Sequence, residues 1–123
     1  MRHYQIGEDP GPLEEWPFDN PLSDYKILSG TPRASGRLDM GGPGQATRSG
    51  IWRCTEGRFS CIEQGDEMMT VLSGRGTLTD IETSAVQELT PGDTVFIKDG
   101  MQAIWEIEEV LTKAFFGFKP DGY

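Results

Sequence analysis

The second half of the chain divides into short runs rich in β-branched and aromatic residues, each ending in a turn. Glycine, proline and aspartate mark these turns, most clearly in Thr90-Pro91-Gly92-Asp93 and Lys98-Asp99-Gly100. Runs of four to eight residues with turn signals every 8 to 12 residues are typical of an all-β sandwich or barrel. We therefore predict strands at residues 51–55, 58–63, 67–72, 76–81, 86–89, 94–97, 103–107 and 111–118.

The first two of these runs are expected to form a hairpin through Glu56-Gly57. That pairing would set Cys54 directly opposite Cys61 on adjacent strands. A disulfide between them is then geometrically possible, although a reducing compartment favours two free thiols. Further along the chain, Ser73-Gly74 is expected to form a turn between two separate strands.

Residues 1–50 differ in composition from the remainder, because they hold six of the eight prolines and a Gly-rich stretch at 41–44. Proline removes a backbone donor and restricts the residue before it, which argues against helices here. We predict an extended Pro/Gly-rich arm with anchoring aromatic residues, then edge strands at 25–28 and 34–40. Residues 1–123 are expected to form one domain, with 1–50 as arm and edge strands and 51–118 as the barrel core.

Charge and hydropathy narrow the range of partners. The net charge is −9, and the sequence contains no cluster of lysine or arginine. Such a chain would be repelled by a phosphate backbone or an anionic lipid surface, so neither nucleic acid nor a membrane is an expected partner. No apolar run approaches the roughly 20 residues that span a bilayer. The first residues also lack the apolar stretch of a secretory signal, so the expected compartment is the cytoplasm.

Several residues of the second half follow the order and spacing of a known pair of motifs. Glu67-x6-Gly74 matches the end of the first motif, and Gly92-x5-Lys98-x-Gly100 keeps the two glycines of the second. On these residues the stretch 57–105 resembles the cupin superfamily. Two short segments, Trp52-x-Cys54-Thr55-x-Gly57-x-Phe59 and Trp105-Glu106-Ile107, narrow the resemblance further. They resemble the small single-domain cupins of unknown function, which are related to ureidoglycine aminohydrolases and to the ethanolamine-utilisation cupin.

The resemblance implies an all-β fold, the double-stranded β-helix or jelly-roll barrel, with the N-terminal arm beside it. It also implies a homodimer formed through the arm and the outer strands. The family's usual metal is held by three histidines and a glutamate, but the positions of the histidines are here Cys61, Glu63 and Ala103. Because His3 is the only histidine of the chain, a three-histidine metal site is impossible.

Strand alternation places residues two apart on one face, which the motif identifies as the barrel interior. Cys61 and Glu63 would share that face with Glu67 and Met69, and with Ala103, Trp105 and Ile107. A small-molecule site would use Trp105 and Trp52 as apolar walls and Glu63 and Glu67 as its placed polar groups. Its other ligand-binding residues would be Met69, Cys61 and Lys113. Alternatively, the tryptophans and Met69 are core packing, and Glu63 lies in water at a strand end. A buried Glu67 needs a partner, for which the candidates are Lys113, Arg53 and Arg58.

Three functions remain open from the sequence. The preferred one is a barrel that binds a small polar metabolite with no cofactor. The second is an enzyme of isomerase, lyase or aminohydrolase type acting on a small nitrogenous or sugar-derived metabolite. It would use Glu63 and Glu67 as an acid/base pair, or an atypical manganese, iron or zinc ion held by Cys61, Glu63 and Glu67. The third is a structural barrel filled by its own side chains. Cys61 is a poor nucleophile, because it lacks a histidine base and has acidic neighbours.

Overall fold

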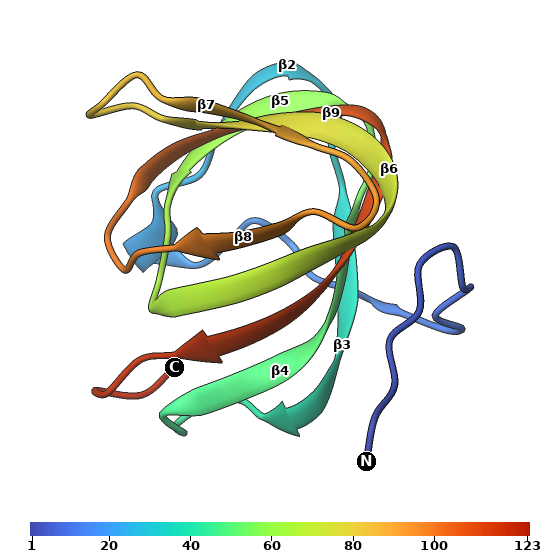
Figure 1. Ribbon diagram of the computed structural model, residues 1–123. Coiled ribbons are helices and arrows are strands. Elements are labelled where there is room, and N and C mark those ends of the chain that lie inside the picture. The colour runs from blue at the N-terminus through green and yellow to red at the C-terminus, as the bar shows by residue number, and fades with distance from the viewer.

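Two long strands, β6 (Asp66–Asp80) and β9 (Gln102–Phe118), run through the whole molecule and organise it. In this computed structural model, which describes residues 1–123, they pair with each other in antiparallel fashion along most of their length. Their pairing register shifts between Val71 and Gly76. The strands curl around a common centre on either side of this irregular stretch, so that each long strand contributes to two facing halves of the barrel (Figure 1).

The remaining strands extend these two halves. One half adds, around residues 111–118 of β9 and 66–73 of β6, the strands β4 (Thr47–Cys54), β3 (Ala34–Gly41), β1 (Glu14–Glu15) and β8 (Thr94–Ile97). The other half adds, around residues 102–107 and 76–80, the strands β5 (Gly57–Ile62), β2 (Lys26–Gly30) and β7 (Val86–Leu89). The predicted all-β jelly-roll architecture is thereby confirmed.

No α-helix is present, and the only helical element is the short 3-10 turn η1 (Pro21–Ser23). No segment of the chain forms a helix of the length and hydrophobicity that crossing a bilayer requires. The turn at Thr90-Pro91-Gly92-Asp93 lies where the turn signal predicted it, between β7 and β8, which pair with different parts of β6 and not with each other.

The predicted hairpin between residues 51–55 and 58–63 is wrong. β4 and β5 do not pair, because β4 lies along residues 111–118 of β9 and β5 along residues 102–107. Cys54 consequently faces Leu111 across the ladder, whereas Cys61 faces Ala103, and both cysteines are free thiols. The chain crosses from one half of the barrel to the other at Gly57, where a Cβ would lie 2.5 Å from Pro32.

The expected turn at Ser73-Gly74 is also wrong, since both residues lie inside the continuous strand β6. Gly74 has φ of +86°, and a Cβ there would come within 2.0 Å of the Val110 carbonyl oxygen on β9. The glycine therefore permits close approach of two bent strands and does not end either of them. For the same reason the predicted strands 103–107 and 111–118 are one strand, β9.

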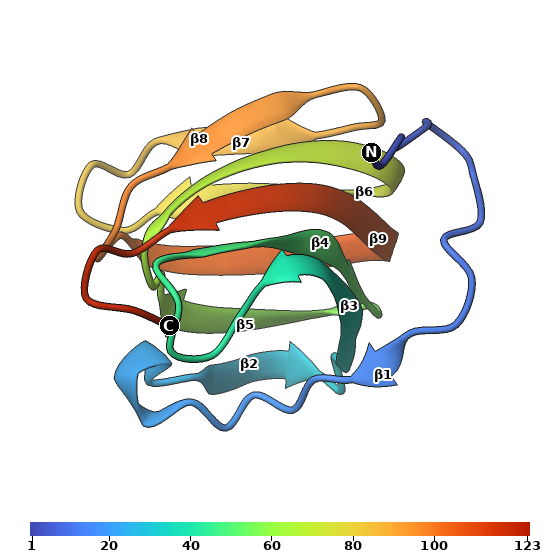
Figure 2. The ribbon, with the colours of Figure 1, turned by 90° about the horizontal axis from the view of Figure 1, so that it is seen from below.

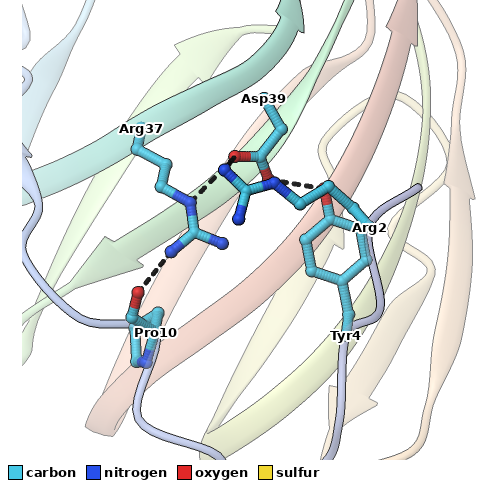
Figure 3. Close-up of polar contacts among 5 residues, drawn as sticks. All are labelled: Arg2, Tyr4, Pro10, Arg37 and Asp39. Atoms are coloured by element: carbon cyan, nitrogen blue, oxygen red, sulfur yellow. Dashed lines mark hydrogen bonds and ion pairs between the residues drawn. The ribbon is translucent and has the colours of Figure 1, made fainter.

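The N-terminal arm passes outside the barrel before it enters β1 (Figure 2). A polar cluster on β3 holds it, with Asp39 at the centre (Figure 3). The buried Asp39 carboxylate accepts from Tyr4 Oη at 2.6 Å and from Arg37 Nε at 2.9 Å, and it lies 3.1 Å from the Arg2 guanidinium. Arg37 also donates to the Pro10 carbonyl oxygen. The arm is thus tied at two points to the outside of its own barrel.

The core lies between the two halves and follows strand alternation. Inward residues two apart are buried along β5, β6 and β9, including Phe59, Met69 and Leu111. A smaller apolar cluster lies on the outer face, where Tyr4 and Leu13 of the arm cover Ile51 and the residues around it. The barrel interior is filled at one end and leaves a cavity at the other.

Candidate functional site

A cavity of about 230 Å³ lies inside the barrel. Half of its fourteen lining residues are aromatic, and they include all three tryptophans of the chain. These aromatic residues are Trp16, Phe18, Tyr25, Trp52, Phe59, Trp105 and Phe115. Trp16, Phe18 and Tyr25 come from the segment that joins β1 to β2, which runs along one side of the barrel (Figure 2). The expectation that aromatic residues anchor this segment agrees with the packing of Phe18 against Phe59, 4.6 Å between ring centroids.

An ion pair lies in the cavity wall. Lys113 on β9 donates through Nζ to Glu67 Oε2 on β6 at 2.5 Å, and both side chains are buried. The ammonium nitrogen also lies 4.9 Å from the ring centroid of Trp52 and 4.7 Å from that of Trp105. Carboxylate and indole faces both stabilise a cation that has left water.

Of the three partners proposed for Glu67, the structure selects Lys113. Arg53 instead donates through Nε to Thr112 Oγ1 at 2.9 Å, and Arg58 is exposed. Lys113 reaches the cavity because it is the cross-strand partner of Trp52, on the inward-facing row. The burial of both charges makes each depend on the other, since a lone charge in this environment would be strongly disfavoured.

A second carboxyl group, that of Glu63, lies just beyond the end of β5 and is held differently. Its Oε1 accepts from Trp105 Nε1 at 2.8 Å, and the Cys61 thiol lies 3.6 Å from the same oxygen. Burial raises the pKa of Glu63, and the nearby Lys113 charge offsets that effect only in part. The cavity thus contains one carboxylate paired with a cation and one carboxyl group shifted towards its neutral form.

Neither thiol is prepared for nucleophilic attack. Burial raises the pKa of Cys61 far above its ordinary value. Burial likewise raises the pKa of Cys54 to about 12, and its Sγ lies 3.4 Å from the Thr55 carbonyl oxygen. Only the thiolate is strongly nucleophilic, so both residues behave as buried apolar groups.

The residues at the family's metal positions do not fit a divalent cation. Ala103 offers no donor atom and is fully buried beside Cys61. The Cys61 thiol is engaged with Glu63, while the Glu67 carboxylate is neutralised by the Lys113 ammonium. No three side chains of the His, Cys, Asp and Glu types come together in metal-binding geometry. The ligand set Cys61, Glu63 and Glu67 is therefore not assembled, and the cation beside Glu67 is a lysine.

Six of the seven predicted site residues line the cavity, namely Glu63, Glu67, Trp105, Trp52, Cys61 and Lys113. Met69 does not, since it lies in the core cluster and is only 1% exposed. Two missed residues, Phe59 and Phe115, lie two positions from Cys61 and Lys113, so strict alternation predicts them.

Arg48 is the most important residue that sequence reasoning missed. It lines the cavity from β4, four residues before Trp52 and therefore on the same face of that strand. Its guanidinium carbon lies 4.0 Å from the ring centroid of Tyr123 and 5.9 Å from that of Phe115. Its Nε is buried and has no hydrogen-bond partner. Only the parity with Trp52 could have suggested this position from sequence.

Comparisons with known proteins agree with this architecture. A protein of the DUF861 family from Pseudomonas syringae pv. tomato is similar, with a TM-score of 0.65 and 21% identity over 85% of this chain and 43% of that one. The EutQ protein of Clostridium difficile has a TM-score of 0.62 and 12% identity over 74% of this chain and 71% of that one. The ethanolamine utilization protein of Salmonella typhimurium has a TM-score of 0.59 and 13% identity over 76% and 72%. Identities this low establish the fold alone.

A search of curated proteins by sequence finds no match. The profile of the EutQ-like cupin domain matches residues 41–115, which is more than half of the chain. This stretch runs from the end of β3 to Phe115 and so includes both long strands up to the cavity wall. The resemblance expected from the motifs is confirmed, and the chain belongs to the EutQ-like cupin family.

Proposed function

We propose that this protein binds a small polar metabolite in the barrel cavity without a histidine-ligated metal. The observation that carries the proposal is the Lys113–Glu67 ion pair in the wall of a cavity otherwise lined by aromatic residues. Ligand sites commonly combine apolar walls with a few placed polar groups, and this cavity has that composition.

The size of the cavity favours a small ligand. A cavity of about 150 Å³ accommodates benzene, so by proportion 230 Å³ accommodates about nine non-hydrogen atoms. Such a volume argues against the alternative of a barrel filled completely by its own side chains. Trp105, which hydrogen-bonds to Glu63 and contacts the Lys113 ammonium through its ring, links the polar groups to the wall.

A metabolite screen tests the proposal. A ligand that binds only the folded state stabilises it by about 2.7 kcal/mol at a hundredfold excess over Kd, which raises Tm. Hits should also change the tryptophan fluorescence, because all three tryptophans line the cavity. Binding is expected to survive dialysis against a chelator. A broad screen without any shift in Tm or fluorescence would refute the proposal, and binding lost on chelation would refute its metal-free part.

A second candidate function is catalysis of proton transfer, and the two unlike carboxyl groups favour it. Glu67 is ion-paired, whereas the pKa of Glu63 is raised by burial, so the pair offers one base and one acid in the same cavity. An isomerase, lyase or aminohydrolase could use such a pair. The relevant test is turnover of any hit from the screen by the wild type and by Glu63→Gln. Catalysis by this pair predicts that turnover falls at least a hundredfold in the variant while affinity is kept. Equal turnover by the two proteins would refute the role of Glu63, and no turnover by the wild type would leave only binding.

A further inference from the structure

We propose that the cavity ligand is a small planar organic carboxylate, whose anionic group pairs with Arg48 and whose flat body lies against the aromatic walls. This inference deepens the proposed function and rests on it, because it requires that the cavity binds a metabolite. Three observations carry it: the charge balance of the cavity, the unpaired state of Arg48, and the shape of the walls.

The charge balance leaves one cation uncompensated. The Lys113 and Glu67 charges neutralise each other at 2.5 Å. The Oε1 atom of Glu63 accepts hydrogen bonds from Trp105 Nε1 and Cys61 Sγ, and burial disfavours the charged form of this carboxyl group. Arg48, which is always charged, is therefore the remaining ionic group of the lining. A cation in the cavity wall without an ion-pair partner favours an anionic ligand, even though the whole chain carries −9.

Arg48 differs from the arginines that are paired with acids elsewhere in the chain. Arg33 pairs with Glu15, Arg37 with Asp39, and Arg75 with Glu108. Arg48 forms no ion pair and keeps a buried Nε without an acceptor, although Tyr123 supports its guanidinium from one side. Buried donors without acceptors are rare in native proteins, so an unfilled donor in a cavity wall indicates a missing acceptor. A carboxylate is the planar acceptor that best matches a guanidinium.

The walls favour a flat ligand body. Seven aromatic residues line the cavity, and the centroids of the Trp52 and Trp105 rings lie 5.5 Å apart, with the ring planes tilted by 47°. Aromatic side chains stack on planar ligands at low conformational cost, because their own rings are rigid. A planar carboxylate of about nine non-hydrogen atoms would fill the volume estimated above.

Three probes of equal shape test the ligand class: benzoate, the neutral benzamide and the cationic benzamidine. Binding is measured by tryptophan fluorescence and by NMR titration of the protein. We expect benzoate to bind at least tenfold more tightly than benzamide, and benzamidine to bind most weakly. In Arg48→Met, benzoate should bind no better than benzamide, whereas benzamide should bind as it does to the wild type. Arg75→Met, which removes an exposed arginine from β6, is the matched control and should leave all three affinities unchanged.

The outcomes separate this inference from the proposed function. Equal binding of benzoate and benzamide, or tighter binding of benzamidine, would overturn the carboxylate class and leave a metabolite-binding cavity standing. The same holds if Arg48→Met keeps the preference for benzoate. Failure of all three probes to bind would also overturn the planar-carboxylate class, whereas the proposed function is refuted only by the broad metabolite screen.

Discussion

The inner and outer faces of the sheet formed by β4, β9 and β6 alternate residue by residue, and each face carries side chains that its surroundings do not favour. Inside, Lys113 and Glu67 bury an ion pair among aromatic rings. Outside, Phe116 and Met68 expose apolar side chains to solvent. The usual distribution places apolar groups inside and polar groups outside, and here both faces depart from it.

Neither the buried ion pair nor the exposed apolar side chains are needed for the stability of the isolated chain. A buried ion pair contributes little net stability compared with well-packed apolar residues, so it is not needed to hold the barrel together. An exposed apolar row gains nothing for an isolated chain. The inner departure supports the ligand proposed above, and variants that act on one face alone can test the comparison.

Breaking the inner ion pair is expected to have the largest effect. Lys113→Met leaves the Glu67 carboxylate buried without a partner, which should lower the free energy of unfolding by about 3–5 kcal/mol. Urea denaturation measures the loss. The double variant Lys113→Met/Glu67→Gln removes both charges and should recover most of it. If the double variant stays as unstable as the single one, packing of the lysine stem and not charge pairing explains the loss.

The neighbouring residues Met69 and Met68 provide a direct comparison of the two faces. Met69 is 1% exposed in the core, so Met69→Ala should cost about 2–5 kcal/mol of unfolding free energy. Met68 is 56% exposed, and Met68→Ala should change the stability of the monomer by no more than about 0.5 kcal/mol. Both are measured by urea denaturation at a concentration where the chain is monomeric. Similar losses for the two variants would contradict the assignment of the faces.

Glu63 should make stability depend on pH. Because burial raises its folded-state pKa, the folded chain keeps this proton at pH values where the unfolded chain has released it. The contribution to stability is full below the ordinary pKa of 4.5 and is lost as the pH rises through the raised value. The loss amounts to about 1.4 kcal/mol for each unit by which the pKa is raised.

Glu63→Gln keeps a neutral group at this position, so its stability relative to the wild type should increase with pH over that interval. Urea denaturation of both proteins from acidic to mildly alkaline pH provides the measurement. Glu56→Gln, at an exposed glutamate, is the control and should show no such trend. A wild-type-to-variant difference that is constant with pH would rule out a raised pKa at Glu63.

The smallest expected effect concerns the thiols of the inner face. Cys54 and Cys61 are buried and their pKa values are raised, so neither should react with a thiol reagent in the folded protein at mildly alkaline pH. Both should react fully once urea unfolds the chain. Rapid modification of either cysteine in the folded state would show that the inner face is open to solvent.

Much of the site was predictable because strand alternation is local. The parity of Cys61 and Glu63 predicted that they share a face, and the motif predicted that this face is the barrel interior, where Glu67 and Trp105 join them from other strands. Local periodicity could not choose the partner of Glu67 among Lys113, Arg53 and Arg58, because that choice depends on which strands pair. The aromatic residues of the segment before β2 were missed as cavity residues for the same reason, since they reach the cavity only through contacts distant in sequence, whereas Arg48 shares its face with Trp52 by alternation.

The sequence by itself determined the all-β class, the cupin resemblance and the absence of a three-histidine metal site, because strand periodicity, motif spacing and histidine content are all properties of the linear chain. Tertiary structure alone decided that β6 and β9 are continuous, that β4 and β5 do not pair, and that an ammonium group accompanies Glu67. A glycine that ends a strand and a glycine that lets two bent strands approach have the same local sequence. Only the neighbouring strand, here the Val110 carbonyl group beside Gly74, distinguishes one from the other.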